Sequence, residues 1–177
     1  MNIENALKIE GAMDPPELEW LAEQAAKHRR IVEIGSWQGR STMVLADNVD
    51  GIVFAVDHWR GSEEHQEMLK DKPKNYIYDI FRRNMRHHLE SATVCMLRMS
   101  SMEAAEKMKG HPVDMVFIDA SHDTDSVIAD ITAWKSLIIT GGLLCGHDYG
   151  YPPVAKAVHD CLRNVSSSGS IWFTEIE

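Results

Sequence analysis

The chain has 177 residues, of which 44% are hydrophobic and 25% charged, a composition typical of one globular domain with its own core. Its net charge of −9 disfavours nucleic acid as a partner, because phosphate contacts need a concentrated basic surface. No apolar stretch approaches the roughly 20 residues that span a bilayer, and the first residues lack a signal-peptide pattern. The three cysteines have no metal-ligand spacing. We therefore expect a cytoplasmic protein with reduced thiols that does not enter the membrane.

Apolar runs and helix-period segments alternate along the chain. The first helix is predicted over residues 14–28, with Asp14 as its N-cap, Pro15 at its first position and Glu17 closing a capping box. Strands are predicted at residues 31–34, 52–56, 92–97, 113–118, 143–145 and 171–176. Helices are predicted at residues 41–48, 76–89, 100–110, 123–137 and 152–161. This alternation predicts an α/β fold with a central, mostly parallel sheet.

We expect a single domain over residues 1–177. Two of its segments do not belong to the alternating strands and helices. Residues 1–30 form a flap and the first helix, and residues 58–90 form an insertion about twice as long as a usual connection, so we expect a lid. Arg82 and Arg86 are spaced to share one helix face and could steer an anionic acceptor. The alternative is a solvated basic face that balances nearby acidic residues, Glu63, Glu64 and Glu67.

Polar residues follow the predicted strands directly. They are residues 35–39, Asp57, Ser100, Asp119, His147 and Asp148. In open α/β sheets ligands bind at this edge, and a carboxylate such as Asp57, about 20 residues after a glycine turn, can accept hydrogen bonds from a ribose. The pair favours an adenosine-containing cofactor over a simple turn. The turn lacks the middle glycine of the dinucleotide fingerprint, and a Walker A lysine is absent, so phosphate-rich ligands are disfavoured.

Three strings, EIGSWQGRST, FIDASHD and GGLLCGHDY, resemble a known family. They are similar to class I S-adenosylmethionine-dependent methyltransferases, in particular the small bacterial branch of cephalosporin-hydroxylase-like and macrolide sugar O-methyltransferases. The resemblance covers nearly the whole chain from about Gly11. It implies a Rossmann-like three-layer α/β sandwich whose last strand is antiparallel, with a shortened penultimate strand at residues 163–165 before a flexible turn at residues 166–169. It also implies S-adenosylmethionine as cofactor and a small-molecule acceptor.

The resemblance further implies which residues bind the cofactor. The methionine half would be lined by Glu33, Gly35, Ser36 and Gly39, with Trp37 bounding the turn. Asp57 would hold the ribose hydroxyls, and His58 would lie against the adenine. The adenine edge would contact Ser100, Ser101 and Met102. Asp119 would lie near the cofactor's amino group and the reacting methyl, where a carboxylate suits the positive charge of a sulfonium. We expect Trp59 at the mouth of this pocket.

Methyl transfer to oxygen needs a group that removes the acceptor's proton. His122 and His147 are the candidates, because imidazole titrates near neutrality, and the sequence does not choose between them. Asp119 and Asp148 are expected to end neighbouring strands, where they could hold Mg²⁺ or Ca²⁺. The catechol-type O-methyltransferases, which these two positions resemble, add an Asn amide, but Tyr149 follows Asp148 here. The metal ligands therefore stay unassigned.

Two other functions stay open. One is a non-catalytic S-adenosylmethionine-binding module. The other is a metal-dependent hydrolase built on the candidate catalytic residues, Asp119, His122, His147 and Asp148. The hydrolase does not explain why the glycine turn and Asp57 lie at the same edge. A homodimer through the lid helix is one alternative for the oligomeric state, and the acceptor cannot be identified from the sequence.

Overall fold

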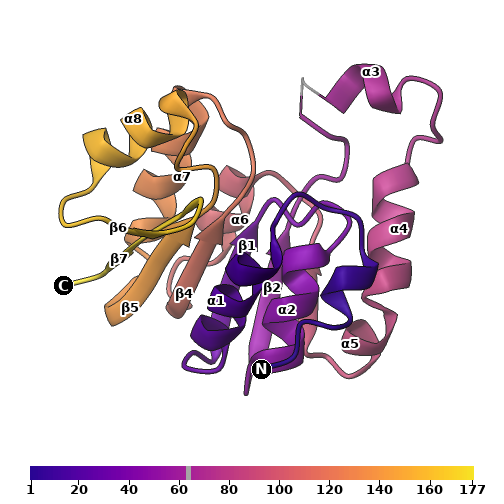
Figure 1. Cartoon of the computed structure of the whole chain (residues 1–177), viewed down its shortest axis with the longest axis horizontal. Coiled ribbons are helices and arrows are strands. Elements are labelled where there is room, and N and C mark those ends of the chain that lie inside the picture. Colours follow the sequence, from indigo (N-terminus) through magenta and orange to yellow (C-terminus); the bar gives the residue numbers. More distant parts are fainter. Residues whose placement is uncertain (63–64) are drawn as a thin grey trace.

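The structure, a computed structural model, describes residues 1–62 and 65–177, and these residues contain one seven-stranded sheet (Figure 1). The strands are β1 (Arg30–Ile34), β2 (Ile52–Val56), β3 (Val94–Leu97), β4 (Val113–Ile118), β5 (Ile138–Gly146), β6 (Ser166–Ser168) and β7 (Ile171–Glu175). Their order across the sheet is β3-β2-β1-β4-β5-β7-β6. The first five strands are parallel, whereas β7 runs antiparallel to β5 and β6 antiparallel to β7.

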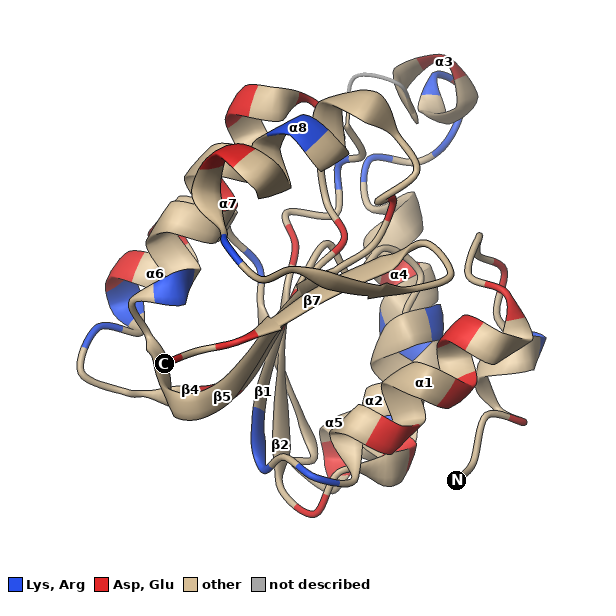
Figure 2. Cartoon of the chain, turned by 60° about the vertical axis from the view of Figure 1, so that its left-hand side comes forward, with Lys and Arg blue, Asp and Glu red and all other residues tan. Residues whose placement is uncertain are grey.

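Helices cover both faces of this sheet, as Figure 2 shows. One face carries η1 (Ala6–Lys8), α1 (Pro15–Ala25), α2 (Arg40–Asn48), α4 (Tyr76–Asn84) and α5 (Arg86–Glu90). The other carries α6 (Ser101–Lys107), α7 (Thr124–Lys135) and α8 (Pro152–Cys161). The short α3 (Gln66–Leu69) stands away from the sheet at the top of Figure 1. The predicted Rossmann-like three-layer sandwich with a mostly parallel sheet is therefore confirmed.

Successive residues of the central strands enter two different cores. In β1, Ile31 packs on the side of α1 and α2, whereas Val32 and Ile34 pack on the side of α6 and α7. In β4, Phe117 packs on the side of α1 and α2, and Val116 packs on the side of α6 and α7. Because side chains alternate across a strand, a parallel strand covered on both faces must be apolar throughout. This is why these strands read as continuous hydrophobic runs.

The carboxyl-terminal part of the sheet differs from the prediction in two ways. The penultimate strand lies at Ser166–Ser168, not at residues 163–165, and pairs with β7, so the expected flexible turn at 166–169 is wrong. An edge strand needs only its backbone to pair, so a serine run can form one. In addition, β5 begins at Ile138, and Gly141 lies within the strand, where the register with β4 shifts.

The helix predicted within the insertion also needs correction. The helix expected over residues 76–89 is broken at Met85 into α4 and α5, so Arg82 and Arg86 do not share a helix face. Arg82 lies over the ring of Tyr78, and the Arg86 Nε donates to Glu90 at 2.9 Å. The acidic residues Glu63 and Glu64 lie outside the described residues. Across the described ranges, no helix is long and apolar enough to cross a membrane.

Candidate active site at the carboxyl edge of the sheet

A cleft with a volume of about 470 Å³ opens at the carboxyl ends of the parallel strands. The strand order reverses between β1 and β4, and such reversal points are where α/β sheets bind ligands. The predicted site residues that line this cleft are Gly35, Ser36, Trp37, Asp57, His58, Ser100, Ser101, Met102, Asp119, His122, His147 and Asp148. One continuous cleft therefore joins the expected cofactor residues to the candidate catalytic residues.

The glycine turn is fixed by close backbone contacts. Gly35 has φ +90°, and a Cβ there would lie 2.0 Å from the carbonyl oxygen of Asp119, so only glycine fits. The Trp37 N–H donates to Asp57 Oδ2 at 2.9 Å, and the Trp59 N–H donates to Oδ1 at 2.5 Å. Burial raises the pKa of Asp57, and these two hydrogen bonds oppose the rise. Asp57 thus ties the ends of β1 and β2 together at the floor of the cleft.

Glu33 and Gly39 are outside the cleft, contrary to the prediction that they line it. Gly39, with φ +94°, is the N-cap of α2, so the helix begins at Arg40, one residue before the predicted start at Ser41. Glu33 is fully buried below the turn, where it accepts a hydrogen bond from the Thr42 hydroxyl. Burial raises the pKa of Glu33 to about 7, against hydrogen bonds that lower it. Glu33 supports the turn from beneath because its strand position directs it toward α2.

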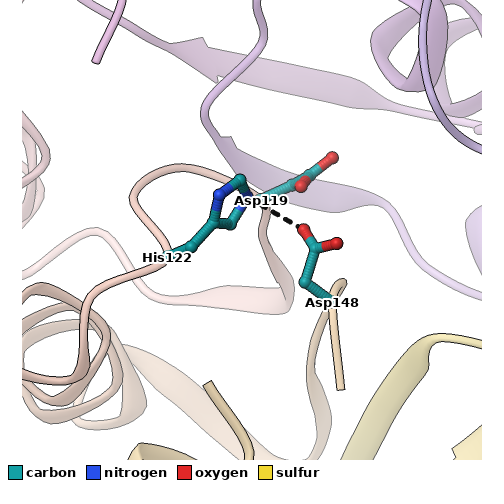
Figure 3. Close-up of side chains that lie close together, drawn as sticks. All are labelled: Asp119, His122 and Asp148. Carbon is teal, nitrogen blue, oxygen red and sulfur yellow. Dashed lines mark ion pairs between the residues drawn. The ribbon is translucent and has the colours of Figure 1, made fainter. Parts of the chain in front are cut away.

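The carboxylates that end β4 and β5 lie together, as predicted, and His122 lies beside them (Figure 3). His122 Nε2 lies 3.0 Å from Asp148 Oδ2, and His147 Nδ1 lies 3.3 Å from the same oxygen. His147 Nδ1 is also 4.0 Å from Asp119 Oδ1. Figure 3 shows His122 and Asp148 pointing toward each other beside Asp119. Asp148 has φ +59°, a backbone conformation that is uncommon for a residue with a side chain.

Glu17 is a site residue that the sequence does not reveal. Its Oε2 lies 3.2 Å from His147 Nε2, and its Oε1 accepts the Ser170 N–H at 2.9 Å. The capping box with Asp14, which the sequence predicts, is also present. Glu17 therefore joins the start of α1, the hairpin between β6 and β7, and the carboxyl edge of the sheet. The capping pattern was its only sequence signal, and that pattern says nothing about a distant histidine.

The carboxylates around His147 set its charge. Burial lowers the pKa of His147, but the hydrogen bond to Asp148 and the charge of Asp119 outweigh this and raise it to about 9. The hydrogen bonds from His122 and His147 hold the pKa of Asp148 well below its usual range. Burial raises the pKa of Asp119 to about 6. At neutral pH His147 is therefore an imidazolium whose two ring N–H groups face carboxylates.

This donor set fits a hard divalent cation poorly. Ligand atoms of Asp119, His122 and Asp148 do lie within 4.8 Å of one another. However, Mg²⁺ and Ca²⁺ prefer an oxygen-rich shell, and the third member here is an imidazole. The Tyr149 hydroxyl lies 3.1 Å from His159 Nε2, so it is engaged elsewhere. His147 already places a positive charge beside both carboxylates.

The flap and the insertion contribute to the walls of the cleft. Arg40 donates through Nη1 to the Ile9 carbonyl at 2.8 Å and through Nη2 to the Met13 carbonyl at 2.9 Å. These bonds hold residues 10–13, which form part of the cleft wall. From the insertion, His65 lines the cleft and stacks on Trp37 with ring centroids 4.3 Å apart. Helix α4 packs into the core instead.

Trp59 is buried as well, contrary to the expectation that it lies at the mouth of the pocket. Its side chain is 1% exposed, and its ring packs against Phe81 of α4 with centroids 4.8 Å apart. The indole N–H donates to the Trp37 carbonyl at 2.9 Å. Trp59 therefore braces the glycine turn from behind, and the part of the insertion that packs into the core anchors the turn.

Comparisons with known proteins agree with this architecture. A family model described as a methyltransferase domain matches residues 32–149. The protein y4gI of Sinorhizobium fredii (strain NBRC 101917 / NGR234), described as uncharacterized, is 30% identical over 135 residues. That match covers 73% of this chain but 14% of the relative, so the chain spans a small part of that protein's length.

Two solved structures share the fold. An O-methyltransferase from Bacillus cereus in complex with SAH has a TM-score of 0.68 and 20% identity, covering 98% of this chain and 90% of that one. The cofactor-bound protein Rv0187 from MTB has a TM-score of 0.71 and 16% identity, covering 98% and 86%. The family match runs from β1 to just beyond β5 and includes most of the cleft. The chain therefore belongs to the methyltransferase domain family, in agreement with the family that its three sequence motifs resemble.

Proposed function

We propose that this protein transfers the methyl group of S-adenosylmethionine to an oxygen of a small-molecule acceptor. The observation that carries the proposal is the single cleft that holds both the glycine turn with Asp57 and the cluster of Asp119, His122 and Asp148. A hydroxyl acceptor has to lose its proton during transfer, and an imidazole held by a carboxylate is suited to remove it. A non-catalytic binding module would have no use for that cluster.

The cofactor would lie along the carboxyl edge. The turn at Gly35, Ser36 and Trp37 presents its backbone to the cleft, and Asp57 offers carboxylate oxygens to a ribose. His58 and the start of α6, with Ser100, Ser101 and Met102, would surround the adenine. When bound, S-adenosylmethionine supplies an electrophilic methyl group on a sulfonium. The carboxylate of Asp119 would face that positive charge, which favours its ionised form.

His122 is the better of the two candidate bases. His147 is 8% exposed, carries a raised pKa of about 9, and has carboxylates at both ring nitrogens, so it holds its proton at neutral pH. The His122 side chain is 32% exposed, lines the cleft and is oriented by Asp148 at 3.0 Å. As His122 takes the acceptor's proton, the ionised Asp148 stabilises the imidazolium that forms. His147 would act as a positioning residue that keeps Asp148 ionised.

A turnover assay tests this proposal. The purified protein would be incubated with S-adenosylmethionine and a panel of small hydroxyl compounds, and S-adenosylhomocysteine formation would be followed. Acceptor-dependent formation that Asp57→Ala abolishes would support the proposal. Asp50→Ala is the matched control, because Asp50 pairs with Arg29 on the exposed surface. Cofactor binding with no turnover on any acceptor would favour the binding module, and metal binding without cofactor binding would favour the hydrolase.

A further inference from the structure

Asp130 is a buried carboxylate that the proposed chemistry does not use. It lies in α7, is 6% exposed, and lines the cleft together with Ala129 and Ser126 of the same helix. A buried carboxylate is costly unless it is hydrogen-bonded, so its place on a ligand cleft calls for a donor. Of the other carboxylates that line the cleft, Asp57 has been placed at the ribose, Asp119 at the reacting methyl and Asp148 at His122, and Glu10 is exposed.

Contacts on one side of Asp130 fix its orientation. The Trp134 Nε1–H donates to Ser101 Oγ at 2.8 Å, and the Ser101 hydroxyl donates to Asp130 Oδ1 at 2.5 Å. The indole nitrogen can only donate, so the direction of both bonds is determined. Burial raises the pKa of Asp130 to about 6, which leaves it mostly ionised at neutral pH. This chain also ties α7 to the first residue of α6.

The second oxygen of Asp130 is available to a ligand. Over residues 1–62 and 65–177, Ser101 is the one side chain that donates a hydrogen bond to this carboxylate, and it uses Oδ1. Oδ2 is also not among the fully buried polar atoms that lack a partner, so it retains contact with the solvent of the cleft. Asp130 Oδ2 is therefore a fixed hydrogen-bond acceptor that can bind an N–H or O–H group of a ligand.

The neighbours of this oxygen favour a flat base with an amino group at its edge. Ser101 joins Asp130 directly to the segment of residues 100–102, the segment assigned above to the adenine, and Met99 and Ala129 add apolar surface to the cleft. An acceptor-only group suits the exocyclic amino group of adenine and repels a carbonyl oxygen at the same position. We propose that Asp130 reads the 6-amino group of the cofactor's adenine and so makes the site selective against 6-oxopurine analogues.

This inference rests on the proposed function, and binding measurements can separate the two. Calorimetric titrations would compare S-adenosylhomocysteine with S-inosylhomocysteine, which has a carbonyl oxygen in place of the amino group. The wild-type protein should bind the amino form about tenfold more tightly or better, since the carbonyl oxygen would leave the buried carboxylate oxygen without a hydrogen-bond donor. Equal affinities in the wild-type protein would overturn the inference without any variant.

The variant Asp130→Asn tests the residue itself. An amide can donate to a carbonyl oxygen. The ratio of the affinity for S-adenosylhomocysteine to that for S-inosylhomocysteine should therefore fall toward one or below it. Asp125→Asn removes the same charge from an exposed position of α7 and should keep the wild-type ratio. A wild-type ratio in Asp130→Asn would show that Asp130 only ties α6 to α7. If S-adenosylhomocysteine bound to neither the wild-type protein nor Asp125→Asn, the proposed function itself would fail.

Discussion

Glu17 and His147 lie 3.2 Å apart, although 130 residues separate them in the sequence. The contact places the start of α1 against the residue that ends β5 at the cleft. His147 in turn contacts Asp148, and Asp148 contacts His122, so one line of ionisable groups runs from a buried helix start to the candidate base. The charge state of the site therefore depends on a residue outside the cleft.

Glu17→Gln tests this dependence. Glutamine can still close the capping box, so α1 should fold, but the negative charge beside His147 is lost. We expect the pKa of His147 to fall below about 9, and the rate constant of methyl transfer to fall about tenfold while cofactor affinity is kept. NMR titration of the imidazole and steady-state kinetics would measure the two effects. Glu23→Gln, an exposed residue of α1, is the control. An unchanged His147 pKa would contradict the coupling.

The two histidines should respond differently to substitution. His122→Asn removes the proposed base, so kcat should fall by about 100-fold or more while S-adenosylhomocysteine affinity stays within a few-fold. His147→Asn removes a positioning residue, so its loss of kcat should be smaller and should shift the pH profile of the reaction. A larger loss of kcat in His147→Asn than in His122→Asn would reverse the assignment of the base.

The stability of the protein should depend on pH through Glu33. Its folded-state pKa of about 7 lies above the ordinary glutamate pKa of 4.5, so the folded state favours the protonated carboxyl. This contribution is fully present below about pH 4.5 and is lost as the pH rises through about 7. Relative to Glu33→Gln, the free energy of unfolding of the wild-type protein should fall by about 3 kcal/mol across that window.

Urea unfolding at several pH values would measure this difference. Glu19→Gln, which changes an exposed carboxylate of α1, should follow the wild-type curve and serves as the control. If the free energies of unfolding of the wild-type protein and Glu33→Gln changed with pH in parallel, Glu33 would be ionised in the folded protein. Cofactor binding should also depend on Glu33 through the turn that it supports, since Glu33 lies outside the cleft itself.

Methyl transfer should be independent of divalent cations. His147 carries the positive charge that faces Asp119 and Asp148, and the remaining donors suit a hard cation poorly. Rates measured with EDTA and with added Mg²⁺ should agree within a factor of about two, which is less than 1 kcal/mol. A strong stimulation by Mg²⁺, lost in Asp148→Asn, would instead identify these carboxylates as ligands.

The sequence predicts the order of elements and the place of the site because both depend on local pattern. Parallel strands buried on both faces have to be apolar, and ligand residues follow them at the carboxyl edge, so the sequence alone places Asp57, Asp119 and Asp148 at one edge. The adjacency of Asp119 and Asp148 follows from the neighbouring positions of β4 and β5.

The rest depends on contacts that no local pattern encodes. Glu17 meets His147, and Arg40 holds the flap, through packing between elements far apart in the chain. The serine strand β6 pairs through its backbone, so its side chains gave no strand signal. The prediction of Trp59 at the mouth of the pocket is wrong because a tryptophan after a strand suits either a pocket or a core. In the structure its indole N–H donates to the Trp37 carbonyl.

Isothermal titration of S-adenosylhomocysteine and, separately, of NAD⁺ into the wild-type protein and Asp57→Ala tests the cofactor assignment most directly. The proposed site predicts micromolar binding of S-adenosylhomocysteine by the wild-type protein, a large loss of that affinity in Asp57→Ala, and no binding of NAD⁺. Undiminished S-adenosylhomocysteine binding by Asp57→Ala, or no binding by the wild-type protein, would contradict the assignment of this cleft.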